Sequence, residues 1–189
     1  MDKDIIIALI GESGMGKTTI AKELYEKENI NVIQSYTTRK PRERNEWGHI
    51  FASWLYEIME GFYINPDELP SSVIAHKKLY NEHYWATKEQ FEGFGTSIYI
   101  IDPESAKMLK SKVNVPVYTI LLTVSSDIRC KRLIENRHQV EALYRLHEDE
   151  KIFDKQTMDS DFVINVSNPL QENVNNVLKA IRLIEKKEE

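Results

Sequence analysis

The stretch that decides the fold class of this chain is Gly11-Glu12-Ser13-Gly14-Met15-Gly16-Lys17-Thr18. An apolar run over residues 5–10 precedes it, and an amphipathic run over residues 20–25 follows it. These flanks predict a buried strand before the glycine-rich turn and a helix after it. The stretch therefore fits the Walker A pattern G-x-x-x-x-G-K-[ST] in the structural context that this pattern requires.

The composition of the turn predicts a loop that binds phosphate. Its glycines lack Cβ atoms, so the backbone can curl tightly and direct its N–H groups inward. The positive end of the following helix adds to the attraction for anions. We expect Lys17 to reach the β- and γ-phosphates of ATP and the Thr18 hydroxyl to bind Mg²⁺. The predicted ATP-binding residues are Gly11, Glu12, Ser13, Gly14, Met15, Gly16, Lys17, Thr18 and Thr19.

The length and composition describe one globular domain with its own core, since the chain has 189 residues, 41% of them hydrophobic and 29% charged. A net charge of −5 argues against a general nucleic-acid binder. Cys130 is the only cysteine, which excludes an intramolecular disulfide and suits a reducing compartment. We find no signal peptide pattern and no apolar run of membrane-spanning length. We therefore expect a cytoplasmic protein, monomeric or homodimeric, that has no membrane or nucleic-acid partner.

Apolar runs that alternate with helical patterns predict an α/β fold of the P-loop NTPase type. Its centre is a parallel sheet of about five strands with helices on both faces. Strands are expected at residues 5–10, 32–33, 98–101, 117–122 and 162–164. Helices are expected at 18–27, from Pro103 onward, after a cap at Ser126 or Asp127, and from about 169 to 184.

A second polar stretch, Ser35-Tyr36-Thr37-Thr38-Arg39-Lys40-Pro41-Arg42, follows the second expected strand. Pro41 disfavours helix at the residue before it, so Arg39 and Arg42 are expected on a loop. Two guanidinium groups with neighbouring hydroxyls suit a phosphate monoester, although a solvated basic loop has the same composition. We expect a single domain over 1–189, with a core of 1–34, 93–127 and 158–189, an acceptor-binding region at 35–92 and a lid at 128–157.

The pattern S-x-T-T-R-x-x-R at this distance from the glycine-rich turn resembles guanylate kinase, the nucleoside monophosphate kinase family that phosphorylates GMP. The resemblance implies that Ser35, Arg39 and Arg42 bind the acceptor nucleotide, mainly through its phosphate. It continues at His83-Tyr84-Trp85-Ala86-Thr87-Lys88-Glu89, which implies that Tyr84 contacts the acceptor phosphate. It also continues at Ile101-Asp102-Pro103-Glu104-Ser105-Ala106, which implies an acceptor-site role for Asp102.

The resemblance further implies lid arginines that reach the transferring phosphates, at Arg137 and Arg145, with Arg132 as an alternative. These arginines lie in a run of charges that is also typical of a solvated helix face. Asp102 has a second interpretation as well, as the cap of the helix that follows it.

The positions that read the bases differ from the family pattern. The acidic residue that reads guanine corresponds to Ala75, and the family's acidic residue two before the aspartate is Ile100. An acceptor-contacting tyrosine corresponds to His49, or to Phe51 in another register. The adenine-side asparagine corresponds to Asn165 or Asn168. The phosphate-handling parts are thus retained, while the base preference stays open.

The predicted function is an ATP-dependent nucleoside monophosphate kinase that uses Mg²⁺ and phosphorylates GMP or dGMP, with Lys17, Arg39, Arg137 and Arg145 as catalytic residues. The acceptor phosphate is largely a dianion at pH 7, because its second pKa is about 6. No general base is therefore required, and no histidine is assigned a role. The alternatives are a kinase for another nucleotide or for a phosphorylated small molecule, and a non-catalytic guanylate-kinase-like binding module. The intact Gly16-Lys17-Thr18 sequence disfavours the binding module.

Overall fold

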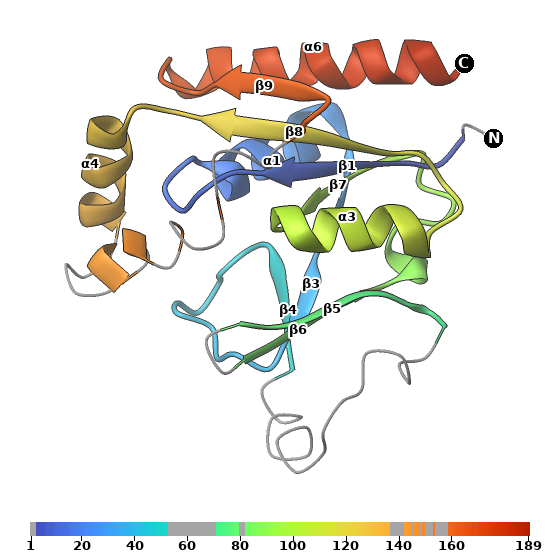
Figure 1. Ribbon diagram of the computed structural model, residues 1–189, viewed down its shortest axis with the longest axis horizontal. Helices are drawn as coiled ribbons and strands as arrows, with labels where there is room; N and C mark the ends of the chain where they lie inside the picture. Colours follow the sequence, from blue (N-terminus) through green and yellow to red (C-terminus); the bar gives the residue numbers. More distant parts are fainter. Residues whose placement is uncertain are drawn as a thin grey trace.

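The computed structural model describes residues 3–52, 71–79, 82–136, 142–144, 146–147, 149, 153 and 159–189. At its centre is a five-stranded parallel sheet in the order β2-β7-β1-β8-β9 (Figure 1). The strands of this sheet are β1 (Ile5–Ile10), β2 (Asn31–Ile33), β7 (Thr96–Ile100), β8 (Val117–Thr123) and β9 (Phe162–Asn165). Each strand begins and ends within two residues of its expected range, so the predicted fold class is confirmed.

The helices among the described residues are α1 (Lys17–Glu28), α3 (Pro103–Lys112), α4 (Ser126–Asn136), α6 (Leu170–Glu188) and the short 3₁₀ helix η3 (Lys88–Gln90). Helix α3 begins at Pro103, as expected. The cap predicted for α4 was wrong, because Ser126 and Asp127 already lie in its first turn and Ser125 precedes it. Ser125 and Ser126 carry the same side chain, so residue type could not distinguish the two positions. None of these helices has the length and apolar character needed to cross a membrane.

The central sheet separates two apolar cores, because successive side chains of a strand point to opposite faces. Ile7 of β1 packs with Leu24 of α1 and Ile181 of α6 on one face. Ile6 of the same strand belongs to the other core, with Leu109 of α3. Helices therefore cover both faces, which gives the three layers seen in Figure 1.

A second sheet of four strands, in the order β4-β3-β6-β5, lies below the central sheet in Figure 1. Its strands are β3 (Ser35–Thr37), β4 (His49–Phe51), β5 (Val73–Leu79) and β6 (Glu82–Thr87). Tyr36 of β3 stacks on Trp85 of β6 with 5.4 Å between ring centroids. This sheet was not predicted, and it falls within the 35–92 region in which we expected the acceptor site.

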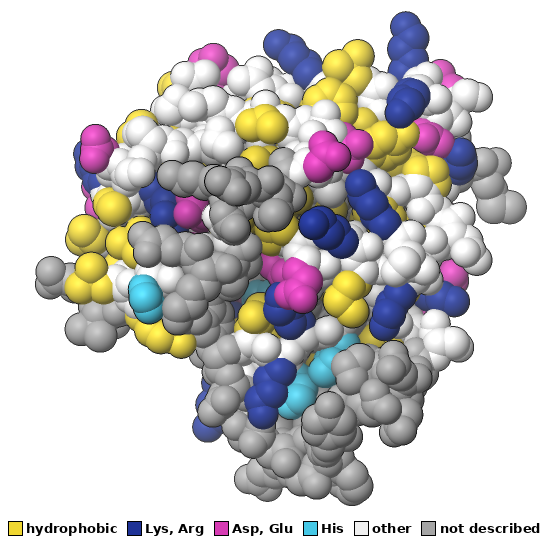
Figure 2. Space-filling view, in the orientation of Figure 1, with side chains coloured by type: hydrophobic (Ala, Val, Ile, Leu, Met, Phe, Trp, Pro, Cys, Tyr) yellow, Lys and Arg dark blue, Asp and Glu magenta, His cyan; other side chains and the backbone are white. Residues whose placement is uncertain are grey.

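The surface seen in Figure 2 carries basic, acidic and neutral side chains that are interspersed. Among the described residues on that face, Lys and Arg side chains are scattered rather than gathered in one basic patch.

Candidate active site

The glycine-rich turn leads directly from the buried strand β1 into helix α1. Gly16 is the N-cap of α1 and has φ 82° and ψ 17°, a left-handed conformation that residues with a side chain rarely adopt. Gly14 has φ 86°, and a Cβ atom there would lie 3.0 Å from Cγ of Leu133. Both positions therefore require glycine, and the resulting turn precedes the positive end of α1, where anions bind favourably.

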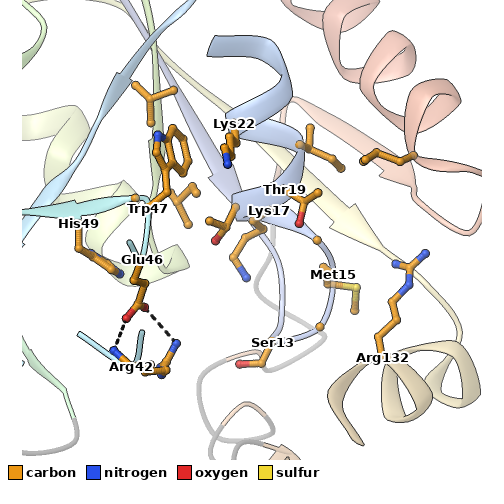
Figure 3. A pocket seen from close by; sticks show the side chains of 18 of the residues that line it. Ser13, Met15, Lys17, Thr19, Lys22, Arg42, Glu46, Trp47, His49 and Arg132 are labelled. Carbon is orange, nitrogen blue, oxygen red and sulfur yellow. Dashed lines mark hydrogen bonds and ion pairs between the residues drawn. The ribbon is translucent and has the colours of Figure 1, made fainter. Parts of the chain in front are cut away.

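A cavity of about 820 Å³, here called the larger cavity, opens over this turn (Figure 3). Residues 13–19, all predicted to bind ATP, line it. Figure 3 shows Arg42, Glu46 and His49 on one side of Lys17, and Arg132 of α4 on the other. The turn thus lies between two arginines, Arg42 on one side and Arg132 on the other.

A second cavity of about 270 Å³, here called the smaller cavity, adjoins the first. All the residues predicted to bind the acceptor line it, namely Ser35, Arg39, Arg42, Tyr84 and Asp102. Lys17, Thr18, Ser35 and Arg42 line both cavities, so the two spaces meet at the start of α1. A triphosphate over the turn and a phosphate monoester in the smaller cavity would be neighbours.

Lys17 and Thr18 lie at this junction. The Lys17 ammonium group donates hydrogen bonds to the backbone carbonyls of Gly11 and Glu12, the latter at 3.0 Å. Thr18 is exposed, and its hydroxyl suits Mg²⁺, which commonly takes one or two protein oxygens and completes its shell with substrate phosphates and water. Within the described part of the chain no cluster of three or more His, Cys, Asp or Glu side chains offers a separate metal site.

One carboxylate, Glu46, holds both arginines of the acceptor loop. Its oxygens accept hydrogen bonds from Nη1 and Nη2 of Arg39 at 3.1 and 2.7 Å, and from the Arg42 backbone N–H at 2.6 Å. Burial alone would raise the pKa of Glu46, but the hydrogen bonds and charges of the two arginines outweigh it and hold that pKa at about 2. Sequence reasoning missed Glu46, because its pairing with Arg39 and Arg42 depends on the path of an irregular loop and not on a helical or strand spacing.

His49 also lines both cavities, whereas Phe51 is not among the described lining residues and lies beneath the Arg39 guanidinium group, 5.2 Å from centroid to Cζ. The His49 ring packs edge-on against Tyr84 at 5.7 Å. Burial, followed by the positive charge of Arg39, lowers the pKa of His49 to about 4. A neutral imidazole therefore stands beside the arginines at pH 7.

A buried ion-pair network joins α4 to the glycine-rich turn. Arg129 is 7% exposed and pairs with Asp149 at 2.7 Å and with Glu12 at 2.9 Å. The Asp149 carboxylate accepts a hydrogen bond from the Ser13 backbone N–H at 2.8 Å, and Arg129 Nε donates to the Ser13 carbonyl at 3.1 Å. Sequence reasoning placed Arg129 in a solvated charge run and so missed this network.

Some of the remaining predicted residues line the larger cavity, and others do not. Glu12 pairs with Arg129 and is not among the described residues that line either cavity. Arg137 and Arg145 lie outside the described residues. Of the two candidate asparagines, Asn168 lines the larger cavity, while Asn165 accepts a hydrogen bond from the Ser167 backbone N–H at 2.9 Å. The alternative lid arginine, Arg132, lines the larger cavity.

The structure confirms one of the two interpretations of Asp102, the helix cap, while its acceptor-site role stays a prediction. Asp102 caps α3 by accepting a hydrogen bond from the Ser105 backbone N–H at 3.1 Å. It also lines the smaller cavity, so this carboxylate fixes the start of a helix and remains in position to contact a ligand there.

The chain is similar in sequence to several bacterial guanylate kinases. Guanylate kinase of Clostridium tetani is 28% identical over 145 residues, which cover 75% of this chain and 67% of that protein. Guanylate kinase of Onion yellows phytoplasma is 31% identical over 116 residues, or 58% of this chain and 52% of that protein. The matches thus span between about half and two thirds of these relatives. No protein-family profile matches the chain.

Among solved structures, guanylate kinase from Anaplasma phagocytophilum superposes with a TM-score of 0.63 at 16% identity, covering 98% of this chain and 88% of that one. A gluconokinase from Sinorhizobium meliloti superposes with a TM-score of 0.53 at 13% identity, covering 98% and 94%. At these identities the structural matches speak for the fold alone.

The strand order, the turn after β1 and the two adjoining cavities define a P-loop protein of the small-molecule kinase type. Within that class, the sequence relatives that this chain resembles are guanylate kinases, the family that the motifs predicted.

Proposed function

We propose that this protein is an ATP-dependent nucleoside monophosphate kinase that transfers the γ-phosphoryl group of ATP to GMP or dGMP. The observation that carries the proposal is the junction of the two cavities at Lys17 and Thr18, with Arg39 and Arg42 on the acceptor side. Positive charge gathered at that junction offsets the repulsion between two polyanionic substrates. The curated relatives named guanylate kinase favour a guanine nucleotide as the acceptor.

In the proposed reaction an oxygen of the acceptor phosphate attacks the γ-phosphorus of ATP. The bond from that phosphorus to the β,γ-bridging oxygen breaks, so ADP leaves and a nucleoside diphosphate forms. The acceptor phosphate is largely ionised at pH 7, so no proton has to be removed. A pKa of about 4 makes His49 a weak base at pH 7, and the reaction does not require one. Lys17 stabilises the charge on the transferring group, and Arg39 and Arg42 orient the acceptor.

The Thr18 hydroxyl would hold Mg²⁺, which neutralises charge on the β- and γ-phosphates when it is bound. Asn168 and Arg132 line the larger cavity, and Figure 3 shows Arg132 on the side away from Arg42. Both would face the adenosine part of ATP. Arg137 and Arg145, in the lid at 128–157, would add positive charge over the transferring phosphate. We expect the enzyme to act in the cytoplasm as a monomer or homodimer.

A coupled ADP-release assay across the common nucleoside and deoxynucleoside monophosphates tests the proposal. We expect turnover with GMP or dGMP, and loss of at least about 10³-fold in Lys17→Ala, the scale seen when one phosphate-stabilising cation is removed. Circular dichroism must show that the variant stays folded. Turnover with sugar phosphates alone would contradict a nucleotide acceptor. If none of the tested acceptors is phosphorylated, a non-catalytic binding module is favoured.

A further inference from the structure

Lys77 on β5 projects into the smaller cavity beside the residues at the ends of β7 and α3. Its ammonium nitrogen lies 2.9 Å from Oδ1 of Asp102 and 2.9 Å from Oε2 of Glu104. The Lys77 side chain is 26% exposed and the Asp102 side chain 14% exposed, so both remain accessible from the cavity. This cation–carboxylate pair joins the second sheet to the start of α3.

The pair has hydrogen-bonding capacity beyond these contacts. An ammonium group has three N–H donors, and two of those of Lys77 point to Asp102 and Glu104. Burial lowers the pKa of Lys77, but the hydrogen bonds to the two carboxylates outweigh it, so the net shift is upward and the group stays charged. Asp102 Oδ1 accepts from Lys77 and from the Ser105 N–H, and Oδ2 accepts from the Ser105 hydroxyl. A carboxylate offers about four acceptor sites, so one on Asp102 is left for a ligand.

The side chains around this pair offer little competition. Ala75 and Leu79, on the same strand, are apolar. The His76 ring is engaged with His83 at 3.0 Å, and the Tyr99 hydroxyl accepts a hydrogen bond from Ser35 at 3.2 Å. Lys77 and Asp102 are the oppositely charged pair in this part of the cavity, with a donor and an acceptor side by side for the edge of a heterocyclic base.

We propose that Lys77 determines the base specificity of the acceptor site by donating its third N–H to a 6-oxopurine, shared between O6 and N7. This inference rests on the proposed function. Guanine presents two adjacent acceptors, N7 and O6, and pairing with lysine or arginine is its commonest specific contact. Adenine places an amino donor where guanine has O6, which would face the ammonium group of Lys77. Asp102 accepts from the N1–H that lies beside O6.

The test compares GMP, IMP and AMP as acceptors for wild-type protein and for Lys77→Met. IMP shares O6, N7 and N1–H with GMP, so the substitution should lower kcat/KM for both by the same factor, about 10- to 100-fold. The value for AMP, measured as its inhibition constant against GMP if turnover is too slow, should change less than about threefold. The GMP-to-AMP preference should therefore collapse. Lys77→Arg keeps N–H donors at this position and should retain the preference for GMP over AMP.

Lys78→Met is the matched control, because Lys78 is exposed, is the next residue of the same strand and is not among the described lining residues. It should leave the preference unchanged. If Lys77→Met does not fold, Lys77→Gln takes its place. Equal losses for GMP, IMP and AMP would show that Lys77 only braces α3 and would overturn the inference. Wild-type protein that phosphorylates no nucleoside monophosphate would overturn the proposed function and the inference together.

Discussion

Arg39 and Glu46 form a two-point ion pair in which Nη1 and Nη2 of the guanidinium group meet the two carboxylate oxygens at 3.1 and 2.7 Å. The Glu46 side chain is 12% exposed and also binds the Arg42 backbone. One carboxylate therefore fixes the loop that carries both arginines proposed to bind the acceptor. Fixing charged groups in advance lowers the cost of binding a phosphate in the right place.

Replacing Glu46 by Gln should impair use of the acceptor much more than use of ATP. The amide keeps the shape but loses the charge, so Arg39 and Arg42 lose the partner that orients them. We expect kcat/KM for GMP to fall by about 10- to 100-fold, the scale of a small misplacement of a substrate-orienting group. The KM for ATP should change less than about twofold. Glu92→Gln, at an exposed position, is the control, and an unchanged value for GMP would remove Glu46 from the site.

His49 should make folding stability depend on pH between about 6.5 and 4. Its pKa is lowered from 6.5 to about 4 in the folded protein, so in this window the unfolded chain binds more protons. Stability from this group is thus complete above pH 6.5 and is lost as the pH falls toward 4, by at most about 1.4 kcal/mol per pH unit.

Urea unfolding of His49→Phe and wild-type protein at several pH values measures this effect. The difference in unfolding free energy between the two proteins should change across that window in favour of the variant at low pH. His147→Phe, at an exposed histidine, is the matched substitution for comparison. If the unfolding free energies of His49→Phe and wild type change in parallel with pH, the lowered pKa of His49 is contradicted.

Arg129 should matter for stability more than its place in a charged stretch suggests. Arg129→Met leaves the Asp149 carboxylate, whose side chain is 5% exposed, buried without its cation. Breaking a buried pair in this way typically costs about 3–5 kcal/mol. In a double-mutant cycle by denaturant unfolding, Arg129→Met with Asp149→Leu should cost clearly less than the sum of the single changes. Additive costs would show that the two groups do not interact.

The parts of the fold that sequence reasoning predicted are those with local signals. β1 is an uninterrupted apolar run, and the glycines of the turn after it have backbone angles that few other residues tolerate. Asp102 before Pro103 was likewise a local cap signal, which the structure confirms.

The second sheet and its contribution to the site depend on contacts far apart in the sequence. β3 and β4 have three residues each, too few to show a periodicity, and β3 is held by pairing with β6. On β5 a register shift between Val73 and Ala75 decides which side chains point to the cavity, so Lys77 could not be assigned to it in advance. Arg129 acquires its partners Glu12 and Asp149 only when separate segments pack together, whereas Glu46 pairs with Arg39 and Arg42 of its own irregular loop.

Phosphorus-31 NMR of the protein with ATP, Mg²⁺ and GMP tests the central proposition most directly, because it identifies where the phosphoryl group goes. We predict that ATP and GMP signals fall together while ADP and GDP signals rise in equal amounts, and that Lys17→Ala stops this transfer. ADP and inorganic phosphate without GDP, or ATP that stays intact beside GMP, would contradict it.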